Sequence, residues 1–362
     1  MNSNASHLKI ILSIFLKDIK QALVDRMTLG VIIGVMLLIL PSQLIPLILQ
    51  NENTPQAVVL ANRTTSQIQE LRALSDVSIY PVKSQDELQN ALVSGRSLVI
   101  GLVFPDNFTL LDQDGENPVV DAYFPHWTST DEKNSLITLF EEKINTIAGQ
   151  PVQIRVIDDQ VHPDQDSRGA EVMFILQMIN AIMTISLVLV PQLLMSEKEK
   201  HTLEALLISP ANYTDVVIGK GLTGVFYGSL GAGIVILMNQ KIIAHWWVII
   251  LSAISGILFA VLLGLLIGLW FDNFQQATLS MSIIVISIMA PAFIKTILTV
   301  RLPTVVEFLV NWFPSGKLTD LITMSLMKSV PVPEFIIGIS VIWGANLLIF
   351  FLCLWQIRRT QI

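Results

Sequence analysis

The residues with the greatest capacity for chemistry in this sequence form a charged segment, residues 196–220, between two long apolar runs. Its charged side chains include Glu197, Lys198, Glu199, Lys200 and Glu204. Charges of this density are excluded from hydrocarbon, so we expect the segment to lie in water beside a membrane. Leucines at 203, 206 and 207 recur at helical spacing and Ser-Pro follows at 209–210, which predicts a short helix with one apolar face. Such a helix is suited to binding a partner protein.

The other residues with catalytic or ligating side chains do not form a site. The five histidines are His7, His126, His162, His201 and His245, and they are scattered without the spacing of metal ligands. The ATP-binding pattern Gly-x-x-x-x-Gly-Lys followed by Ser or Thr is absent; the nearest segment, 315–318, has Leu after the lysine. The acidic residues of 112–116 lack the twelve-residue spacing of a calcium loop. We therefore expect no catalytic, metal-binding or cofactor-binding residues here, and ATP hydrolysis would require a separate subunit.

The composition indicates a membrane protein with one water-soluble part. Of the 362 residues, 52% are hydrophobic and 14% are charged, against about 25% charged residues in an average soluble domain. Residues 51–171 contain nineteen acidic and eight basic residues, whereas the rest of the chain contains ten and fourteen. An acidic soluble part is therefore joined to a mildly basic membrane part. The single cysteine, Cys353, excludes an internal disulfide.

Hydropathy predicts six transmembrane helices, at 28–49, 172–195, 218–238, 248–271, 278–294 and 335–357. Before the first of them, residues 7–27 are amphipathic, which is typical of a helix in the membrane interface; a solvated lead-in helix is the alternative. Residues 295–334 contain half-length apolar pieces interrupted by prolines and a glycine. These predict re-entrant helices that enter from one face, between spans five and six.

Residues 51–170 are expected to form one small α/β domain. Strand-like runs are at 56–61, 77–82, 97–104, 119–124 and 152–157, and helical runs are at 64–74, 84–93 and 129–147. Ser84 and Glu87 fit a capping box, and Gly95 and Gly149 stand where helices should end.

The distribution of basic residues predicts the topology. With six spans, the terminal segments 1–27 and 358–362 lie on the same side as segments 196–217 and 272–277. Together with bordering Lys220, these four segments hold nine Lys and Arg residues. The short segments on the opposite side hold five. The positive-inside rule then places both termini and 196–217 in the cytoplasm and the acidic domain outside. The expected fold class is an α-helical polytopic membrane protein comprising residues 1–50, an inserted extracellular α/β domain at 51–170, and a five-helix region at 171–362.

The charged segment also resembles the signature of type-2 ATP-binding-cassette (ABC) exporter permeases. The matching residues are Glu-Lys-Glu at 197–199, Thr202-Leu203-Glu204, Leu206-Leu207, Ser209-Pro210 and Gly219-Lys220. The resemblance covers the whole chain, including the interfacial helix, the large external domain, the re-entrant segment and the turn at 273–277, which is similar to the family's second cytoplasmic loop. One position departs from the pattern, because His201 stands where the family usually has glycine.

This resemblance implies a function and partners. It implies the permease subunit of an ABC exporter in a plasma membrane, the bacterial cytoplasmic membrane in particular. Residues 196–217 would contain the coupling helix that docks on a separate ATPase subunit, which carries ATP and Mg. A second permease copy, identical or similar, and membrane lipid are the other implied partners, and nucleic acid is not one. The implied coupling residues are Glu197, Glu199, Thr202, Leu203, Glu204, Leu207 and Pro210. Drugs, lipids, peptides and ions all remain open as substrates.

Polar residues inside the predicted spans have two interpretations. Gln177, Asn180 and Thr184 are candidates for lining the transport pathway, but each also suits hydrogen bonding between helices. Glycines spaced four apart, at 30/34, 224/228 and 264/268, favour close helix packing within one subunit over a subunit interface.

Two other classes of function compete with a permease. A membrane-anchored sensor would bind a ligand with the external domain and signal through the charged segment, but it would need a cytoplasmic output domain that this sequence does not contain. A secondary transporter would need ionisable residues at the membrane midplane, and the predicted spans have almost none.

Overall fold

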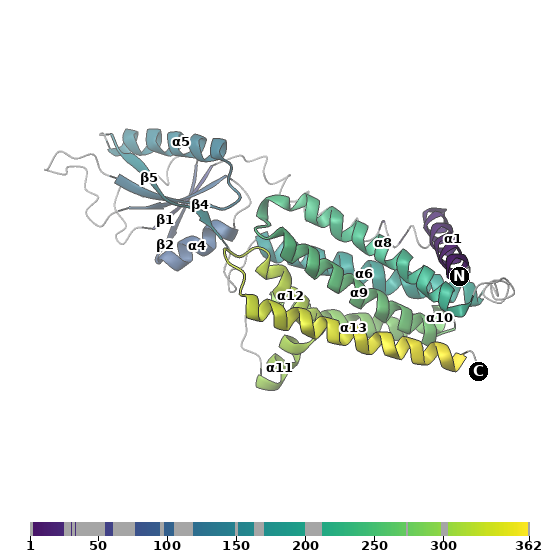
Figure 1. Ribbon diagram of the computed structural model, residues 1–362. Coiled ribbons are helices and arrows are strands. Elements are labelled where there is room, and N and C mark those ends of the chain that lie inside the picture. The colour runs from purple at the N-terminus through teal and green to yellow at the C-terminus, as the bar shows by residue number, and fades with distance from the viewer. Residues whose placement is uncertain are drawn as a thin grey trace. The chain divides into compact units, whose positions relative to one another are not determined.

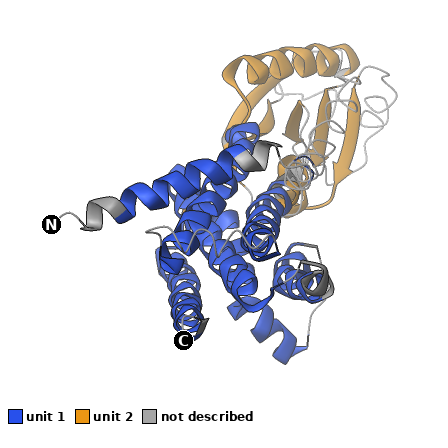
Figure 2. Cartoon of the chain, turned by 90° about the vertical axis from the view of Figure 1, so that its right-hand side faces the viewer, with its two compact units in different colours: residues 1–41, 174–325, 330–362 blue, residues 42–173, 326–329 orange. Residues whose placement is uncertain are grey.

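The computed structural model describes residues 3–24, 30, 33, 55–60, 77–94, 98–104, 119–148, 151–162, 170–199, 212–272, 274–297 and 303–360. The chain divides into two compact units, shown in blue and orange in Figure 2. The helical unit comprises residues 1–41, 174–325 and 330–362, and the α/β unit comprises residues 42–173 and 326–329. The chain therefore passes between the units next to residue 174 and again on both sides of 326–329.

The α/β unit contains a five-stranded sheet. Its strands are β1 (Gln56–Leu60), β2 (Ser78–Val82), β3 (Val99–Val103), β4 (Val119–Pro125) and β5 (Gln153–Val161). They lie in the order β2-β1-β3-β4-β5, and only the pairing of β3 with β4 is antiparallel. Two helices, α4 (Gln85–Ser94) and α5 (Thr130–Ala148), complete the unit as described (Figure 1).

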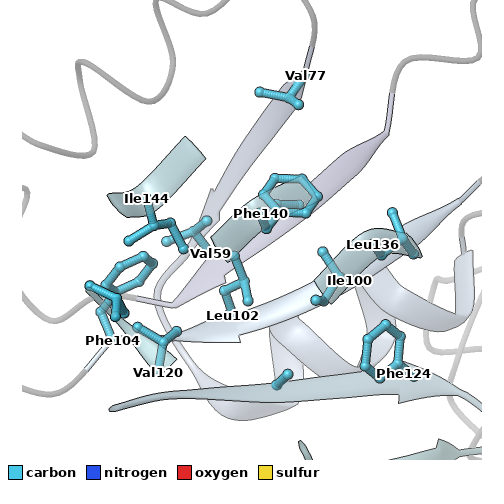
Figure 3. Packing of buried hydrophobic residues seen from close by; sticks show 13 residues of the cluster. Val59, Val77, Ile100, Leu102, Phe104, Val120, Phe124, Leu136, Phe140 and Ile144 are labelled. Atoms are coloured by element: carbon cyan, nitrogen blue, oxygen red, sulfur yellow. The ribbon is translucent and has the colours of Figure 1, made fainter. Parts of the chain in front are cut away.

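Both faces of this sheet are buried, because neighbouring residues of a strand point to opposite sides. Val59 of β1 belongs to the same apolar cluster as Leu136 and Phe140 of α5 (Figure 3). Its neighbour Val58 belongs instead to the cluster that contains Leu88 of α4. The helices thus cover opposite faces, as expected for an α/β fold.

Side-chain caps define where both helices begin. The backbone N–H of Glu87 donates to Ser84 Oγ at 3.2 Å, and Glu87 Oε2 accepts from the N–H of Lys83. At α5, Ser129 and Glu132 form the reciprocal capping box, in which each backbone N–H donates to the other's side chain. These bonds satisfy N–H groups that have no partner within the helix. The predicted cap by Ser84 is confirmed, although Glu87 bonds the N–H of Lys83 rather than that of Ser84, and the box at Ser129 was missed.

The described part of the helical unit contains six long α-helices, two short α-helices and one 3-10 helix. They are α1 (Ser3–Val24), α6 (Ala170–Glu199), α8 (Tyr213–Met238), the 3-10 helix η1 (Gln240–Ile242), α9 (Trp246–Trp270), α10 (Phe274–Ile297), α11 (Thr304–Trp312), α12 (Pro314–Met324) and α13 (Val332–Thr360). α13 runs in the same direction as α9, because Asn346 hydrogen-bonds Ser255 and Cys353 hydrogen-bonds Leu262. Helix α1 and the C-terminal end of α13 lie at the same end of this unit (Figure 1).

Glycines allow α8 and α9 to approach α6 closely. A Cβ on Gly228 of α8 would lie 2.8 Å from Ser186 Oγ of α6, and a Cβ on Gly264 of α9 would lie 2.8 Å from the Ser186 carbonyl oxygen. Both separations are shorter than van der Waals contact allows. The glycine pairs at 224/228 and 264/268 therefore serve packing within one subunit, as predicted.

The two short helices of the predicted re-entrant segment are joined at a sharp turn. Pro314 occupies the first turn of α12, where its missing N–H costs nothing. Gly316 follows, and a Cβ there would lie 2.0 Å from the carbonyl oxygen of Val310 in α11. Only glycine fits at this position. Pro314 and Gly316 therefore mark the turn between α11 and α12.

Four of the described helices are long and apolar enough to cross a membrane: α6, α8, α9 and α13. In α10 the apolar part is shorter, Ser280–Thr296. The first predicted span, 28–49, lies outside the described residues apart from isolated positions. The helices also run further than hydropathy predicted: α6 continues to Glu199, and α8 begins at Tyr213 rather than at 218. Hydropathy marks the residues that suit hydrocarbon, whereas helix hydrogen bonding continues until the backbone turns.

Candidate functional site

A cluster of charged side chains joins α1 to the helix ends on both sides of residues 200–211. Lys220 Nζ, in the second turn of α8, donates to Asp18 Oδ2 of α1 at 3.1 Å. The same ammonium lies 3.1 Å from Glu197 Oε1 in the last turn of α6, and Lys17 Nζ donates to that oxygen at 3.0 Å. We call these four residues the Asp18 cluster.

Three members of the Asp18 cluster are withdrawn from water. The side chains of Lys220 and Asp18 are each 1% exposed and that of Glu197 is 5% exposed, whereas Lys17 is 46% exposed. Burial raises the pKa of the Asp18 carboxyl, and the adjacent Lys220 ammonium opposes part of that rise. The positive charge of Lys220 favours the ionised form of this carboxyl, which burial disfavours.

The rest of α1 packs against α8 and supports this contact. A Cβ on Gly219 would lie 2.8 Å from Ile14 Cγ2, so the glycine lets α1 approach the α8 backbone. Tyr227 donates its hydroxyl to the Ile19 carbonyl at 3.1 Å, and the rings of Phe15 and Phe226 meet edge to face. The lysine beside Gly219 is thereby brought within reach of Asp18.

Lys198 links the end of α6 to the turn between α9 and α10. Its ammonium donates to the carbonyl oxygens of Leu269 and Phe271, at 3.2 and 3.0 Å, and to Asp272 Oδ1 at 3.0 Å. A cation at the C-terminus of a helix satisfies carbonyl groups that have no intrahelical partner. The end of α6 and the residues that follow α9, which were predicted to lie on the same side of the membrane, therefore meet at the same end of the unit.

The first turn of α8 has its own charged contact with α1. His7 Nδ1 lies 2.8 Å from Asp215 Oδ2, and the same oxygen accepts from the backbone N–H of Asn212 at 3.0 Å. A carboxylate at this position also complements the positive end of the helix dipole. α1 is thus attached to α8 by charged contacts on both sides of Ile14.

The predicted coupling residues separate into three groups. Glu197 is buried and points at Lys17 and Lys220, so its carboxylate is turned into the protein rather than toward a partner. Glu199 is exposed at the end of α6. Thr202, Leu203, Glu204, Leu207 and Pro210 lie outside the described residues.

The predicted pathway residues are all on α6 and have different surroundings. Gln177 is buried, and its Oε1 accepts a hydrogen bond at 3.2 Å from Nδ2 of Asn239, the residue that caps the C-terminus of α8. Thr184 donates to Asn180 Oδ1 at 2.8 Å along the same helix, and both are half-buried. Gln177 therefore holds two segments together, and Asn180 and Thr184 remain partly accessible.

Sequence reasoning missed Asp18 and Lys220 as a site. Lys220 was noted only as part of the Gly219-Lys220 signature and as a charge that borders a loop, and nothing in the sequence paired it with Asp18. A local signal did exist, since Lys220 directly follows Gly219 inside a helical pattern and Asp18 lies on the side of α1 opposite its exposed leucines. In the part of the chain that the structure describes, no group of three His, Cys, Asp or Glu residues is placed to hold a metal ion.

The fold and the site define a class: a helical, multi-pass membrane protein with an inserted α/β unit and a charged assembly at one end of its helices. The sequence matches the model of the ABC-2 family transporter proteins over residues 27–356. This match covers most of the chain, and the protein therefore belongs to that family as a permease subunit of an ABC transporter. Members of the family are transmembrane subunits, and their ATPase activity is located on partner proteins. A comparison with curated proteins finds no match.

Proposed function

We propose that this chain is the permease subunit of an ATP-driven exporter and that residues 196–217 transmit the motion of a separate ATPase subunit to the membrane helices. The observation that carries this proposal is the convergence of charged contacts at one end of the helical unit. There the two helices that border residues 200–211 are bonded to each other through Lys220 and Glu197. Lys198 bonds the same region to the turn after α9. A push applied to 200–211 would therefore reach α6, α8 and α9 together.

The ATPase would dock on the part of this segment that is turned outward. Glu199 supports that role because it is exposed at the last residue of α6. Glu204, with the leucines at 203 and 207, would supply a charge and an apolar face a few residues further on. Glu197 takes a different role in this proposal: it holds the base of the segment rather than contacting the partner.

The transport pathway would run along the side of α6 that this chain leaves partly uncovered. Residues at four-residue steps on one side of α6, namely 176, 180, 184 and 188, are half-buried, whereas most of their neighbours are buried. Asn180 and Thr184 make this stripe partly polar. In a pair of permeases, a second copy would face the stripe and enclose a pathway between the two α6 helices.

The orientation in a plasma membrane follows from the same assignment. The end with the Asp18 cluster would face the cytoplasm, where ATP is available. The chain is connected to the α/β unit next to residue 174, near the start of α6, and next to Ser325, after α12, whereas the Asp18 cluster lies at the far end of α6, and this supports an extracellular α/β unit. Such a unit would bind substrate or an accessory protein at the exit.

The test is the assembly of this chain with its ATPase. The tagged protein is purified in mild detergent from the organism that encodes it, and co-purifying subunits are identified by mass spectrometry of their ATP-binding-loop peptides and by vanadate-sensitive ATP hydrolysis. We expect an ABC ATPase with the wild type and at least about a tenfold loss with E199K/E204K, because like charges at a docking surface cost several kcal/mol. The matched control is K241E, which reverses an exposed charge in η1 at the opposite end.

Two results would contradict the proposal. One is the absence of any ABC ATPase from wild-type preparations that retain an intact, monodisperse permease. The other is full ATPase binding by E199K/E204K together with loss of binding by K241E, which would put the docking surface at the wrong end.

A further inference from the structure

The interfacial helix α1 has three distinct sides. Leu8, Leu12 and Leu16 form an exposed apolar stripe at four-residue steps. Lys9 and Lys20 are exposed on the neighbouring side. The third side carries Ile14 and Asp18, which are buried against the helical unit. Two sides of α1 are thus exposed, as expected for an interfacial helix, and the third packs against α8 and α6.

The buried side of α1 is held by a contact that apolar packing alone would not require. Two carboxylates from two different elements share one lysine of a third, and all three side chains are removed from water. Replacing a buried ion pair with apolar side chains is often neutral or stabilising, so such a pair is a poor device for stability. Its geometric demand is strict, however, because a shift of either helix would leave a charge without its partner. Contacts of this kind fix register.

The helices whose relative position is fixed in this way are those that border the segment that would dock on the ATPase. Glu197 precedes residues 200–211 by three positions, and Lys220 follows them by nine. Of Asp18, Glu197 and Lys220, Asp18 alone lies on neither α6 nor α8, and it connects these two helices to α1. The second contact, between His7 and Asp215, holds α1 against the first turn of α8.

We propose that Asp18 and Lys220 are positioning residues for ATP coupling: they bind α1, the end of α6 and the start of α8 into one body that moves with residues 200–211. This rests on the proposed function, and it adds a role for α1 that a surface-bound interfacial helix would not have. When the ATPase closes, α1 is carried along with α8 rather than sliding against it.

A disulfide between α1 and α8 tests the movement directly. A Cβ at residue 219 would lie 3.1 Å from Ile14 Cβ, near the separation of about 3.5–4.5 Å that a disulfide requires. The variant I14C/G219C is made with C353S, so that this chain has no other thiol, and is reconstituted with the ATPase in nanodiscs. Oxidation is quantified by mass spectrometry of the linked peptides. We expect the oxidised complex to hydrolyse ATP at the rate of the reduced one. A rate that falls on oxidation and returns on reduction would overturn the proposal, because α1 would then have to slide.

Removal of the charges tests the positioning role. The variant D18N/K220M removes one positive and one negative charge and leaves Glu197 its contact with Lys17. We expect the complex to assemble, with an unchanged KM for ATP and a kcat lowered about fivefold or more, the lower limit of typical coupling between distant sites. K220R, which keeps the charge, should retain most of the rate. The control D121N/R155Q removes the exposed ion pair between β4 and β5 and should change neither parameter.

The outcomes separate this inference from the proposed function. If D18N/K220M assembles with the ATPase and hydrolyses ATP at the wild-type kcat, Asp18 and Lys220 are not positioning residues, although the permease assignment stands. If its KM for ATP rises together with the fall in kcat, the loss is a general distortion and the positioning role is contradicted. If the wild type binds no ABC ATPase, the proposed function itself fails.

Discussion

Two clusters of lysines and carboxylates lie at opposite ends of the described part of the helical unit, and they differ in their access to water. In the Asp18 cluster, two carboxylates share Lys220, and the three side chains are at most 5% exposed. At the other end, which we call the Asp320 cluster, Lys295 of α10 and Lys317 of α12 share Asp320, and the three side chains are 17 to 25% exposed. Lys317 also lies over the ring of Trp312, 5.4 Å from its centroid.

The structure depends more on the Asp18 cluster than on the Asp320 cluster. Water can solvate the charges of the Asp320 cluster when a partner is lost, because each of these side chains is partly exposed to solvent. The Asp18 cluster has no such alternative, since a buried charge without a partner carries its full desolvation cost. Lysines and carboxylates therefore form a weak contact in the Asp320 cluster, whereas in the Asp18 cluster they fix the relative positions of three helices.

The largest expected effect is the removal of Lys220. K220M leaves Asp18 and Glu197 as buried carboxylates, of which only Glu197 keeps another described lysine, Lys17, and breaking a buried pair in this way costs about 3–5 kcal/mol. We expect a clear fall in the midpoint of thermal unfolding, measured in detergent by tryptophan fluorescence. K241M is the control, because this exposed lysine at the opposite end should change stability by no more than about 0.5 kcal/mol. Equal midpoints for the two variants would remove the distinction between the ends.

A smaller effect is expected from pH, and it has a defined sign. Because burial raises the pKa of Asp18, the folded state holds this proton more tightly than the unfolded chain does. The resulting stability is complete below the ordinary aspartate pKa of about 3.9 and is lost as pH rises through the raised value. The groups that face Asp18 are Lys220, Glu197 and Lys17.

The variant D18N should not lose stability in this way as pH rises, because it has no carboxyl group at position 18. We expect the unfolding midpoint of D18N, relative to that of the wild type, to increase as pH is raised from about 4 toward neutrality. D320N, measured in parallel, controls for the general effect of removing one carboxylate. A relative midpoint of D18N that falls with rising pH would show that Lys220 outweighs burial and that the pKa of Asp18 is lowered.

The smallest effect is expected at the Asp320 cluster itself. Partly exposed ion pairs contribute about 0–1 kcal/mol, so D320N should leave the unfolding midpoint close to that of the wild type. The comparison becomes sharper if D18N and D320N differ, since both replace an aspartate with its neutral isostere. A loss at D320N that matches the loss at K220M would mean that access to water does not decide the strength of these contacts.

Much of the fold could be predicted because its signals are local. All five described strands coincide with predicted runs, since alternating apolar residues and turn residues occur within a few positions of one another. The cap of α4 depends on Ser84 and Glu87, three positions apart, and was equally readable. Gly316 and Pro314 marked the turn between α11 and α12 for the same reason.

The candidate site was less predictable because its partners are distant in sequence. Lys17 and Glu197 are 180 positions apart, and Asp18 and Lys220 are 202 apart. Hydropathy also counts a lysine near the end of a span as a charge in water, whereas α8 begins five residues earlier than the predicted span and encloses Lys220. The sequence indicated which segment to examine, and three-dimensional packing decided that Glu197 turns inward while Glu199 faces out.

The most direct test of the account is a site-specific crosslink from this chain to its ATPase. A photo-crosslinking amino acid is placed at Glu199, beside the Asp18 cluster, or at Lys241, at the opposite end, and the complex is irradiated in native membranes. The account predicts that the ATPase, identified by its ATP-binding-loop peptide, is captured from position 199 and not from position 241. Capture from position 241, or no capture from position 199 in a complex that hydrolyses ATP, would contradict it.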